Sequence, residues 1–318
     1  MKSAIALLLG LLCTRAIAAD SYPNRPVRVI VNFPPGAGVD IATRIVTAEL
    51  AKSFGQQFVI DNRAGAAGNI GVDLAAHAPP DGYTLLSATA AMAISQTIFS
   101  RISYDINRDF SPVAMIASAP FVLAVHPALP ATTLQEVIAL AKAKPGQLTY
   151  ATPGTGSSPH LAFELFKMLA GVDILHIPYK GMVPAVTDVI GGSVSMTCGN
   201  TLTVMPNVRN GRLRGIAITT ARRSAIAPEL PTFAEAGMSG FESGTWYGIM
   251  APANTPRDIV ARLNQAVVRS THLDDLRAKL NAQGAEPLEG SPEQMRKFIR
   301  HEIAKWGKVA KASGAKFE

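Results

Sequence analysis

Residues 27–40 read VRVIVNFPPGAGVD, and this stretch decides the fold. A short strand-like run leads through a glycine-rich turn into a segment with helical periodicity. Residues 148–160, LTYATPGTGSSPH, repeat the same order of run, turn and helix. A turn of this kind presents unpaired backbone N–H groups at a helix N-terminus, where anions bind. Two such turns in separate parts of the chain predict two jaws that close on an anionic ligand.

The first residues predict export. Lys2 precedes a short apolar run, and Ala16-Ile17-Ala18 has the small-x-small pattern of a signal-peptidase site. We expect residues 1–19 to be a cleavable signal peptide, cut after Ala18 or Ala19, and the mature protein to be periplasmic. Cys13 raises the alternative of a lipoprotein, but Leu12 stands where that processing prefers a small residue.

Composition narrows the class of protein. Loss of Lys2 and Arg15 with the signal lowers the formal charge from +7 to +5, and the basic residues form no run. A nucleic-acid surface would need a clustered basic stripe, whereas a mild positive field can attract small anions. Cys198 is then the single cysteine, so no internal disulfide can form. We predict a soluble monomer stabilised by its core.

Strand-like runs alternate with helical patterns along the mature chain, which is typical of an α/β fold. Strands are predicted at 27–31, 58–60, 84–86, 121–125, 148–150, 174–177, 194–197, 215–218 and 247–250. One helix should bury the stripe from Ala42 to Phe54, and another the stripe of Leu161, Leu165, Met168 and Leu169. Thr255 and Ser291 each precede a proline and should cap helices, Ser291 in a capping box with Gln294.

The predicted domains follow from this order. The helical tail, 257–313, should pack back on the first domain, so that the chain passes between domains twice and forms a hinge. Domain 1 then comprises residues 20–122 plus 227–318 and carries the first jaw, while domain 2 comprises residues 123–226 and carries the second.

Several enzyme motifs are incomplete. Gly36-x-Gly38 begins like a dinucleotide fingerprint, with Asp61 after the next strand, but Ile41 replaces the third glycine. No glycine turn continues into the Lys-Ser/Thr of a P-loop. Pro159 and His160 break the G-x-S-x-G frame on either serine, so Ser157 and Ser158 are interpreted as helix caps and ligand donors. The histidines are dispersed, and we predict no metal site and no cofactor.

Two further features each have a structural and a functional interpretation. Cys198, at a strand end, is interpreted as a small buried residue rather than a nucleophile, since no base is evident. Residues 62–71 form a third glycine turn, in which Arg63 either reaches an anion or belongs to a structural loop.

Several motifs in succession resemble the periplasmic receptors of tripartite tricarboxylate transporters, also called Bug proteins. They are 32–40, 61–71, 80–86 (PDGYTLL), 150–160, 178–181 (PYKG), 230–237 (LPTFAEAG) and 246–252 (WYGIMAP). They cover essentially the whole mature chain.

The resemblance implies a type II periplasmic-binding-protein fold: two α/β domains joined by crossing strands. Such a receptor performs no chemistry, captures a small carboxylate and delivers it to membrane permease subunits. The resemblance assigns ligand contacts to the two jaws, largely through main-chain groups and ordered waters. These residues are Phe33, Pro35, Gly36, Ala37 and Gly38 in the first jaw, and Thr155, Gly156, Ser157 and His160 in the second. Thr89, Ala90 and Asn200 are predicted to contact the rest of the ligand.

The chain departs from the family pattern at Ala37, where a second consecutive glycine is common, and at Ser195 and Cys198-Gly199, near the predicted pocket floor. The ligand therefore cannot be copied from a relative. Two alternatives stay open: a sensing adaptor with the same pocket and a membrane signalling partner, and a secreted serine hydrolase using Ser157 or Ser158.

Overall fold

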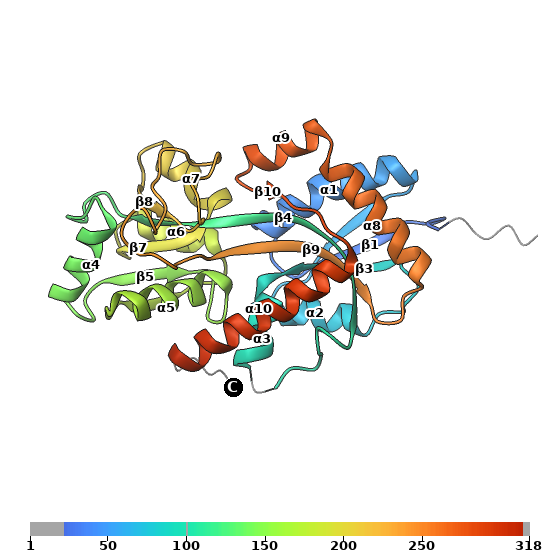
Figure 1. Ribbon diagram of the computed structural model, residues 1–318, viewed down its shortest axis with the longest axis horizontal. Coiled ribbons are helices and arrows are strands. Elements are labelled where there is room, and N and C mark those ends of the chain that lie inside the picture. The colour runs from blue at the N-terminus through green and yellow to red at the C-terminus, as the bar shows by residue number, and fades with distance from the viewer. Residues whose placement is uncertain (1–21, 100, 314–318) are drawn as a thin grey trace, which may run out of the picture.

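The computed structural model describes residues 22–99 and 101–313; the expected signal peptide lies outside these residues. The chain forms an α/β molecule with two lobes (Figure 1). The first lobe contains β1 (Val27–Val31), α1 (Gly38–Phe54), β2 (Phe58–Asn62), the short helix η1 (Ala66–Gly68), α2 (Asn69–Ala76), β3 (Thr84–Thr89) and α3 (Ala90–Ile98). The C-terminal elements α8 (Arg257–Thr271), α9 (Asp274–Ala282), β10 (Glu286–Pro287) and α10 (Pro292–Ser313) return to it.

The second lobe contains α4 (Leu134–Ala143), β5 (Thr149–Thr152), α5 (Ser158–Ala170), β6 (Leu175–Pro178), α6 (Met182–Ile190), β7 (Met196–Asn200), α7 (Thr201–Arg209) and β8 (Arg214–Ile218). Two long strands, β4 (Phe110–Val125) and β9 (Gly244–Pro252), run between the lobes (Figure 1). They pair antiparallel from Phe110↔Pro252 to Pro120↔Gly244.

One continuous sheet connects the lobes, in the order β2-β1-β3-β9-β4-β7-β5-β6, with β8 and β10 also paired to β4. Within each lobe the outer strands are parallel, β1 with β2 and β3, and β5 with β6 and β7. Because the carboxyl ends of parallel strands share one edge, the loops that follow them gather there. This edge is where both glycine turns lie.

Each lobe has its own core. Val29, Val46 and Leu263 are fully buried in one cluster of the first lobe, and Phe121, Tyr150 and Phe163 in one of the second. Phe233 and Phe241, which the predicted boundary assigned to domain 1, pack in this second-lobe cluster. The segment that precedes β9 therefore belongs with the second lobe by its packing.

The C-terminal helix bridges the lobes (Figure 1). Trp306 is fully buried and packs with Ile94 and Ile98 of α3 and with Leu161 of α5. Glu302 accepts hydrogen bonds from the indole N–H groups of Trp246 and Trp306, at 3.1 and 3.0 Å. The helical tail thus packs on the first lobe, as predicted, but also contacts the second.

All nine predicted strands are present, and two local predictions are wrong. Met168 and Leu169 are exposed, at 44% and 49%, because α5 buries Ala162, Phe163 and Phe166 instead. Thr255 does not cap α8, since its hydroxyl donates to the Pro252 carbonyl and Pro256 occupies the N-cap position. The capping box of Ser291 and Gln294 is confirmed.

Candidate functional site

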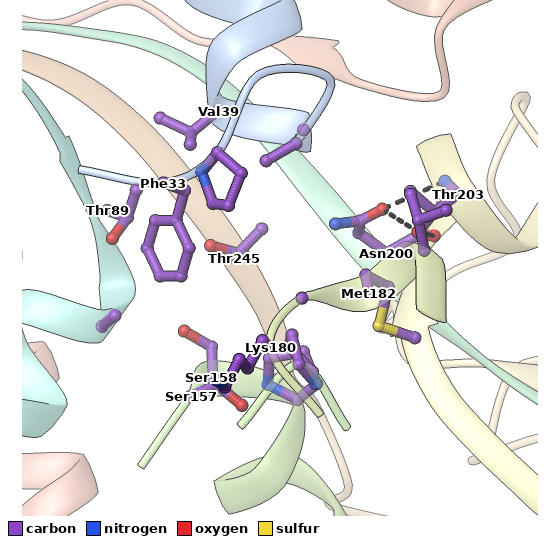
Figure 2. Close-up of a pocket in the computed structure, with 18 of the residues that line it drawn as sticks. Phe33, Val39, Thr89, Ser157, Ser158, Lys180, Met182, Asn200, Thr203 and Thr245 are labelled. Atoms are coloured by element: carbon purple, nitrogen blue, oxygen red, sulfur yellow. Dashed lines mark hydrogen bonds between the residues drawn. The ribbon is translucent and has the colours of Figure 1, made fainter. Parts of the chain in front are cut away.

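A cavity of ≈ 180 Å³ lies between the lobes at the carboxyl edge of the sheet (Figure 2). Residues at or near the first turns of α1, α3, α5, α6 and α7 line it, so that five helix N-termini meet there. Helix N-termini carry unpaired N–H donors and a partial positive charge, which favour an anion. The lining residues are Phe33, Pro34, Pro35, Ala37, Gly38, Val39, Thr89, Ala91, Phe121, Pro153, Ser157, Ser158, Pro159, Lys180, Gly181, Met182, Val183, Pro184, Asn200, Thr203, Thr245 and Tyr247.

The first jaw loop uses some of its amides internally. Gly36, in the left-handed region at φ +79°, donates its N–H to Asp40 Oδ2 at 2.9 Å, and Ala37 donates to the Pro34 carbonyl at 3.2 Å. Among the described residues, the N–H groups of Gly38 and Val39 have no hydrogen-bond partner. The amides available to a ligand are therefore those of the predicted residue Gly38 and of Val39, two and three residues after Gly36.

Ala37 fits this loop without strain. Its φ of −67° and ψ of 154° are ordinary extended values, so the position does not need the glycine that is common in the family pattern. Gly38, by contrast, has no room for a side chain. A methyl group there would lie 2.5 Å from the Tyr247 hydroxyl oxygen and 3.2 Å from Asn200 Nδ2.

Asp40 holds the first loop in place. This buried carboxylate accepts hydrogen bonds from Gly36, from Arg44 Nε at 3.0 Å and from Asn62 Nδ2 at 3.0 Å. Burial alone would raise the pKa of Asp40, but the hydrogen bonds from Arg44, Gly36 and Asn62 outweigh it and keep the pKa below its usual value. Arg44 balances the charge, so the loop presents donors without a net negative charge beside them.

The second jaw loop has a matching arrangement. Gly156, at φ +78°, donates its N–H to His160 Nδ1 at 3.2 Å, and Ser157 donates its N–H to the Gly154 carbonyl. The Ser157 hydroxyl caps α5 by accepting from the His160 N–H at 3.4 Å. Within the part of the chain that the structure describes, the N–H of Ser158 has no partner. The N–H of Thr155 likewise has no partner among the described residues, so these two amides of the loop remain available.

A stack of aromatic rings supports the second loop from behind. His160 stacks on His176 with ring centroids 4.1 Å apart, and Tyr150 stacks on Phe163 at 3.8 Å. Burial lowers the pKa of His160 to about 4 and that of His176 to about 3. Both rings are thus neutral near pH 7, as the acceptor role of His160 Nδ1 requires.

The cavity floor runs across the sheet. Thr89, Tyr247, Phe121 and Asn200 come from the neighbouring strands β3, β9, β4 and β7. Asn200 Oδ1 accepts hydrogen bonds from the N–H and hydroxyl of Thr203, at 3.1 and 2.7 Å, so its Nδ2 is the group left to serve a ligand (Figure 2). At the other end, the Thr89 hydroxyl is buried and has no hydrogen-bond partner in the described structure.

The cavity contains little charge. Lys180 is the only basic residue among the lining residues, and none of them is acidic. Phe33 and Met182 (Figure 2) line it together with Phe121 and several prolines. Among the described residues, no three or more His, Cys, Asp or Glu side chains form a group that could hold a metal ion.

The geometry does not support nucleophilic chemistry at the second loop. The Ser157 hydroxyl donates to the Gly154 carbonyl at 2.6 Å rather than to a base. Cys198 is fully enclosed, and burial raises its pKa to about 12, which keeps it a thiol. It is a small core residue, as interpreted from the sequence.

The third glycine turn has a structural arrangement. Arg63 pairs with Asp61 at 2.9 Å instead of reaching into the cavity. Asp61 also pairs with Arg28, so two arginines contact this carboxylate. Residues 64–68 line a neighbouring cavity of ≈ 430 Å³, the outer cavity. It shares with the first, inner cavity the residues Phe33, Pro34, Pro153, Ser157, Lys180 and Gly181.

Most of the sequence-predicted ligand residues meet in the inner cavity. Phe33, Pro35, Ala37, Gly38, Thr89, Ser157 and Asn200 line it, and Thr155 lines the outer one. Gly36, Ala90, Gly156 and His160 line neither cavity, and Gly36, Gly156 and His160 support the loops instead. Ser158, interpreted from the sequence as a ligand donor beside Ser157, also lines the inner cavity. Sequence reasoning missed Val39, Phe121, Lys180, Met182 and Tyr247. The PYKG motif was a usable signal for Lys180.

Comparison with known proteins gives one consistent result. The family model described as "Tripartite tricarboxylate transporter family receptor" matches residues 42–315. Protein BugT of Bordetella pertussis is 40% identical over 304 residues, which cover 95% of this chain and 93% of the relative.

Solved structures agree. The R. palustris protein Rpa4515, determined with adipate, has a TM-score of 0.89 and 39% identity, covering 93% of this chain and 100% of that one. MatC from Rhodopseudomonas palustris, determined with malate, has a TM-score of 0.84 and 32% identity, covering 91% of this chain and 99% of that one. The predicted periplasmic-binding-protein fold is confirmed.

Proposed function

The chain belongs to the tripartite tricarboxylate transporter receptor family, and from this premise we propose that it captures a small carboxylate between its lobes and delivers it to the membrane permease. It is a solute-binding receptor and not an enzyme, in keeping with its family. The two solved relatives named above were determined with the carboxylates adipate and malate. Among the described residues, no helix has the length and apolar character needed to cross a membrane.

The observation that carries the proposal is the pair of facing helix N-termini. Gly38 and Val39 offer free N–H groups from the first lobe, and Ser158 offers one from the second, around one cavity. Hydrogen bonds to a charged group contribute about 1.5–3 kcal/mol each, whereas association costs on the order of 4–15 kcal/mol. One loop alone leaves little net affinity, so both loops must contact the same carboxylate.

Closure about a hinge belongs to this proposal. The crossing strands meet the second lobe at Phe121 and Gly244, and we place the hinge there. Residues 20–122 then move with the C-terminal elements, and residues 123–226 form the second domain together with the segment around Phe233 and Phe241. The sequence predicted that the chain returns to the first domain at residue 227, and we now propose that it returns just before β9.

The processing, location and oligomeric state of the mature protein are also part of the proposal. Residues 1–19 act as a cleavable export signal, and the receptor works as a periplasmic monomer. Mass spectrometry of the secreted protein would locate the cleavage site after Ala18 or Ala19. Light scattering with and without ligand would measure the oligomeric state, and a stable dimer would contradict this part.

The proposal is tested with a panel of carboxylates and matched primary amides. Binding should raise the melting temperature, since a ligand at 100 times its dissociation constant stabilises a protein by about 2.7 kcal/mol. Calorimetry should then give affinity for an acid and none for its amide. Small-angle scattering should show a more compact particle at saturation. Failure of every carboxylate to bind, or equal binding of acids and amides, would refute the proposal.

A further inference from the structure

The second jaw lies directly against a side chain of the opposite lobe. Gly156 is buried, and a methyl group added to it would lie only 2.8 Å from Cδ1 of Ile98. Ile98 is the last residue of α3 in the first lobe, whereas Gly156 belongs to the loop before α5 in the second. Because glycine has no side chain, the loop backbone can approach Ile98 this closely. The two lobes therefore meet here through one side chain and one backbone turn.

Ile98 belongs to an apolar cluster that includes residues of both lobes. Ile98 and Ile94 of α3 share this cluster with Trp306 of α10. Leu161 of α5 joins them from the second lobe, and all four side chains are at most 3% exposed. Figure 1 shows α10 running along α3 toward α5. Glu302 fixes the Trp306 indole by accepting its N–H at 3.0 Å, so the first-lobe side of the cluster is held firmly.

This interlobe contact lies outside the ligand site. Ile98, Leu161 and Trp306 line neither the inner nor the outer cavity. Helix α3 connects the contact with the site, because its N-cap residue Thr89 lines the inner cavity and its last residue meets Gly156. A contact that forms between the lobes and touches no ligand stabilises the closed state equally, whichever acid is bound.

Building on the proposed function, we propose that Ile98 is a positioning residue for the second jaw: its side chain is the stop against which Gly156 comes to rest when the lobes close. In the open state this contact separates, and the cluster is exposed to water on its Leu161 side. Closure buries that apolar surface again, which favours the closed state. The contact thereby sets the closed position of the second jaw and the balance between the open and closed forms.

Ile98→Val tests this role because it removes Cδ1, the atom that faces Gly156. Adipate and malate are the first probes in calorimetry, followed by the other acids of the panel. We expect every acid that binds to bind about two- to tenfold more weakly, as for the loss of one buried methyl group. The ratio of affinities between any two acids should stay the same. Stopped-flow kinetics should place the loss in faster dissociation, because the contact forms after capture.

Ile299→Val is the matched control. Ile299 is a buried isoleucine of α10, 1% exposed, and its cluster among the described residues contains no helix of the second lobe. The two variants should lose similar free energies of unfolding in chemical denaturation, since each deletes one buried methyl group. Ile299→Val should nevertheless keep the wild-type affinity and dissociation rate, because it leaves the interlobe contact intact.

The fluorescence of Trp306 measures the separation of the cluster directly. The chain has two tryptophans, so the emission of Trp246→Phe comes from Trp306 alone. Saturation with adipate or malate should shift this emission to shorter wavelength, because closure removes water from the Leu161 side of the cluster. Unchanged emission at proven saturation would refute the separation. This measurement needs no change at Ile98, so it decides even if Ile98→Val does not fold.

The outcomes separate this inference from the proposed function. Wild-type affinity in Ile98→Val, or an equal loss of affinity in Ile299→Val, would refute the positioning role while carboxylate binding stands. A changed ratio between two acids would also refute it, since Ile98 would then act on the ligand site itself. If no acid binds to the wild-type protein, the proposed function fails, and this is seen before any variant is compared.

Discussion

Gly38→Ala should damage the binding cleft although the backbone accepts alanine. The added methyl group would lie 2.5 Å from the Tyr247 hydroxyl oxygen, and Tyr247 is only 2% exposed and cannot move aside freely. Overpacking of this kind costs about 1–3 kcal/mol. If this overlap arises when the lobes close on the ligand, carboxylate affinity falls by about five- to 150-fold. Calorimetry with the tightest ligand of the panel measures the loss, and chemical unfolding measures stability.

Removal of the opposing hydroxyl should reverse most of the effect, and only the 3.2 Å approach to Asn200 Nδ2 then remains tight. In Gly38→Ala/Tyr247→Phe the nearest ring atom is Cζ, 3.4 Å from the new methyl group, which is an ordinary contact. Gly307→Ala on α10 controls for the general effect of the change, because its methyl group would lie 3.5 Å from Thr97 Cγ2. Wild-type affinity in the single variant would refute the reasoning. So would an equal loss in the double variant, since the overlap would then not be its cause.

Three further predictions concern the supports of the two loops. Asp40→Ala should weaken carboxylate binding by about tenfold in calorimetry, because the Gly36 N–H loses its acceptor and Asn62 loses one of its two, and unchanged affinity would contradict this role. The pKa of His160 is lowered to about 4, so the free energy of unfolding should be highest above pH 6.5 and should decrease as the pH drops toward 4. Chemical unfolding across this pH range measures the decrease, which should be smaller in His160→Gln. Glu302→Leu should lower the unfolding free energy by about 2–6 kcal/mol by leaving two indole N–H groups unpaired, whereas Glu302→Gln keeps an acceptor and should cost less; equal losses would refute this.

The positions of the strands were predicted well because a short run of apolar residues can be recognised without knowledge of the partner strand. The length of β4 was missed, since its 16 residues include Pro112 and Pro120 and its pairing with β9 shifts register twice. No two-residue pattern identifies β10 either, because it exists only through its pairing with Ser118 and Ala117. These features depend on the partner strand and not on the local sequence.

Helix faces were harder to predict than helix positions. In α5 the stripe of Leu161 and Leu165 was extended to Met168 and Leu169, but the buried side turns toward Phe163 and Phe166. Two overlapping apolar stripes exist on this helix, and only the positions of the sheet and of α10 decide between them. The same limit applies to Phe233 and Phe241, whose lobe is set by tertiary packing.

The site was predicted in outline because glycine turns before helices have a direct physical meaning. The particular amides could not be predicted, since Gly36 and Gly156 lose theirs to side chains that fold back from the helix. In hindsight the spacing is the same in both loops. Asp40 follows Gly36, and His160 follows Gly156, by four residues.

This shared spacing explains how the jaws remain fit for an anion. Each loop needs an acceptor to fix a glycine in the left-handed region, and an acceptor near an anion site is a source of repulsion. The first loop uses a carboxylate whose charge Arg44 balances. The second uses a buried ring that is neutral near pH 7, and Lys167, the nearby cation, is already paired with Glu164 at 2.8 Å. A carboxylate in place of His160 would find Lys167 already paired with Glu164, so the two loops reach the same electrostatic result by different residues.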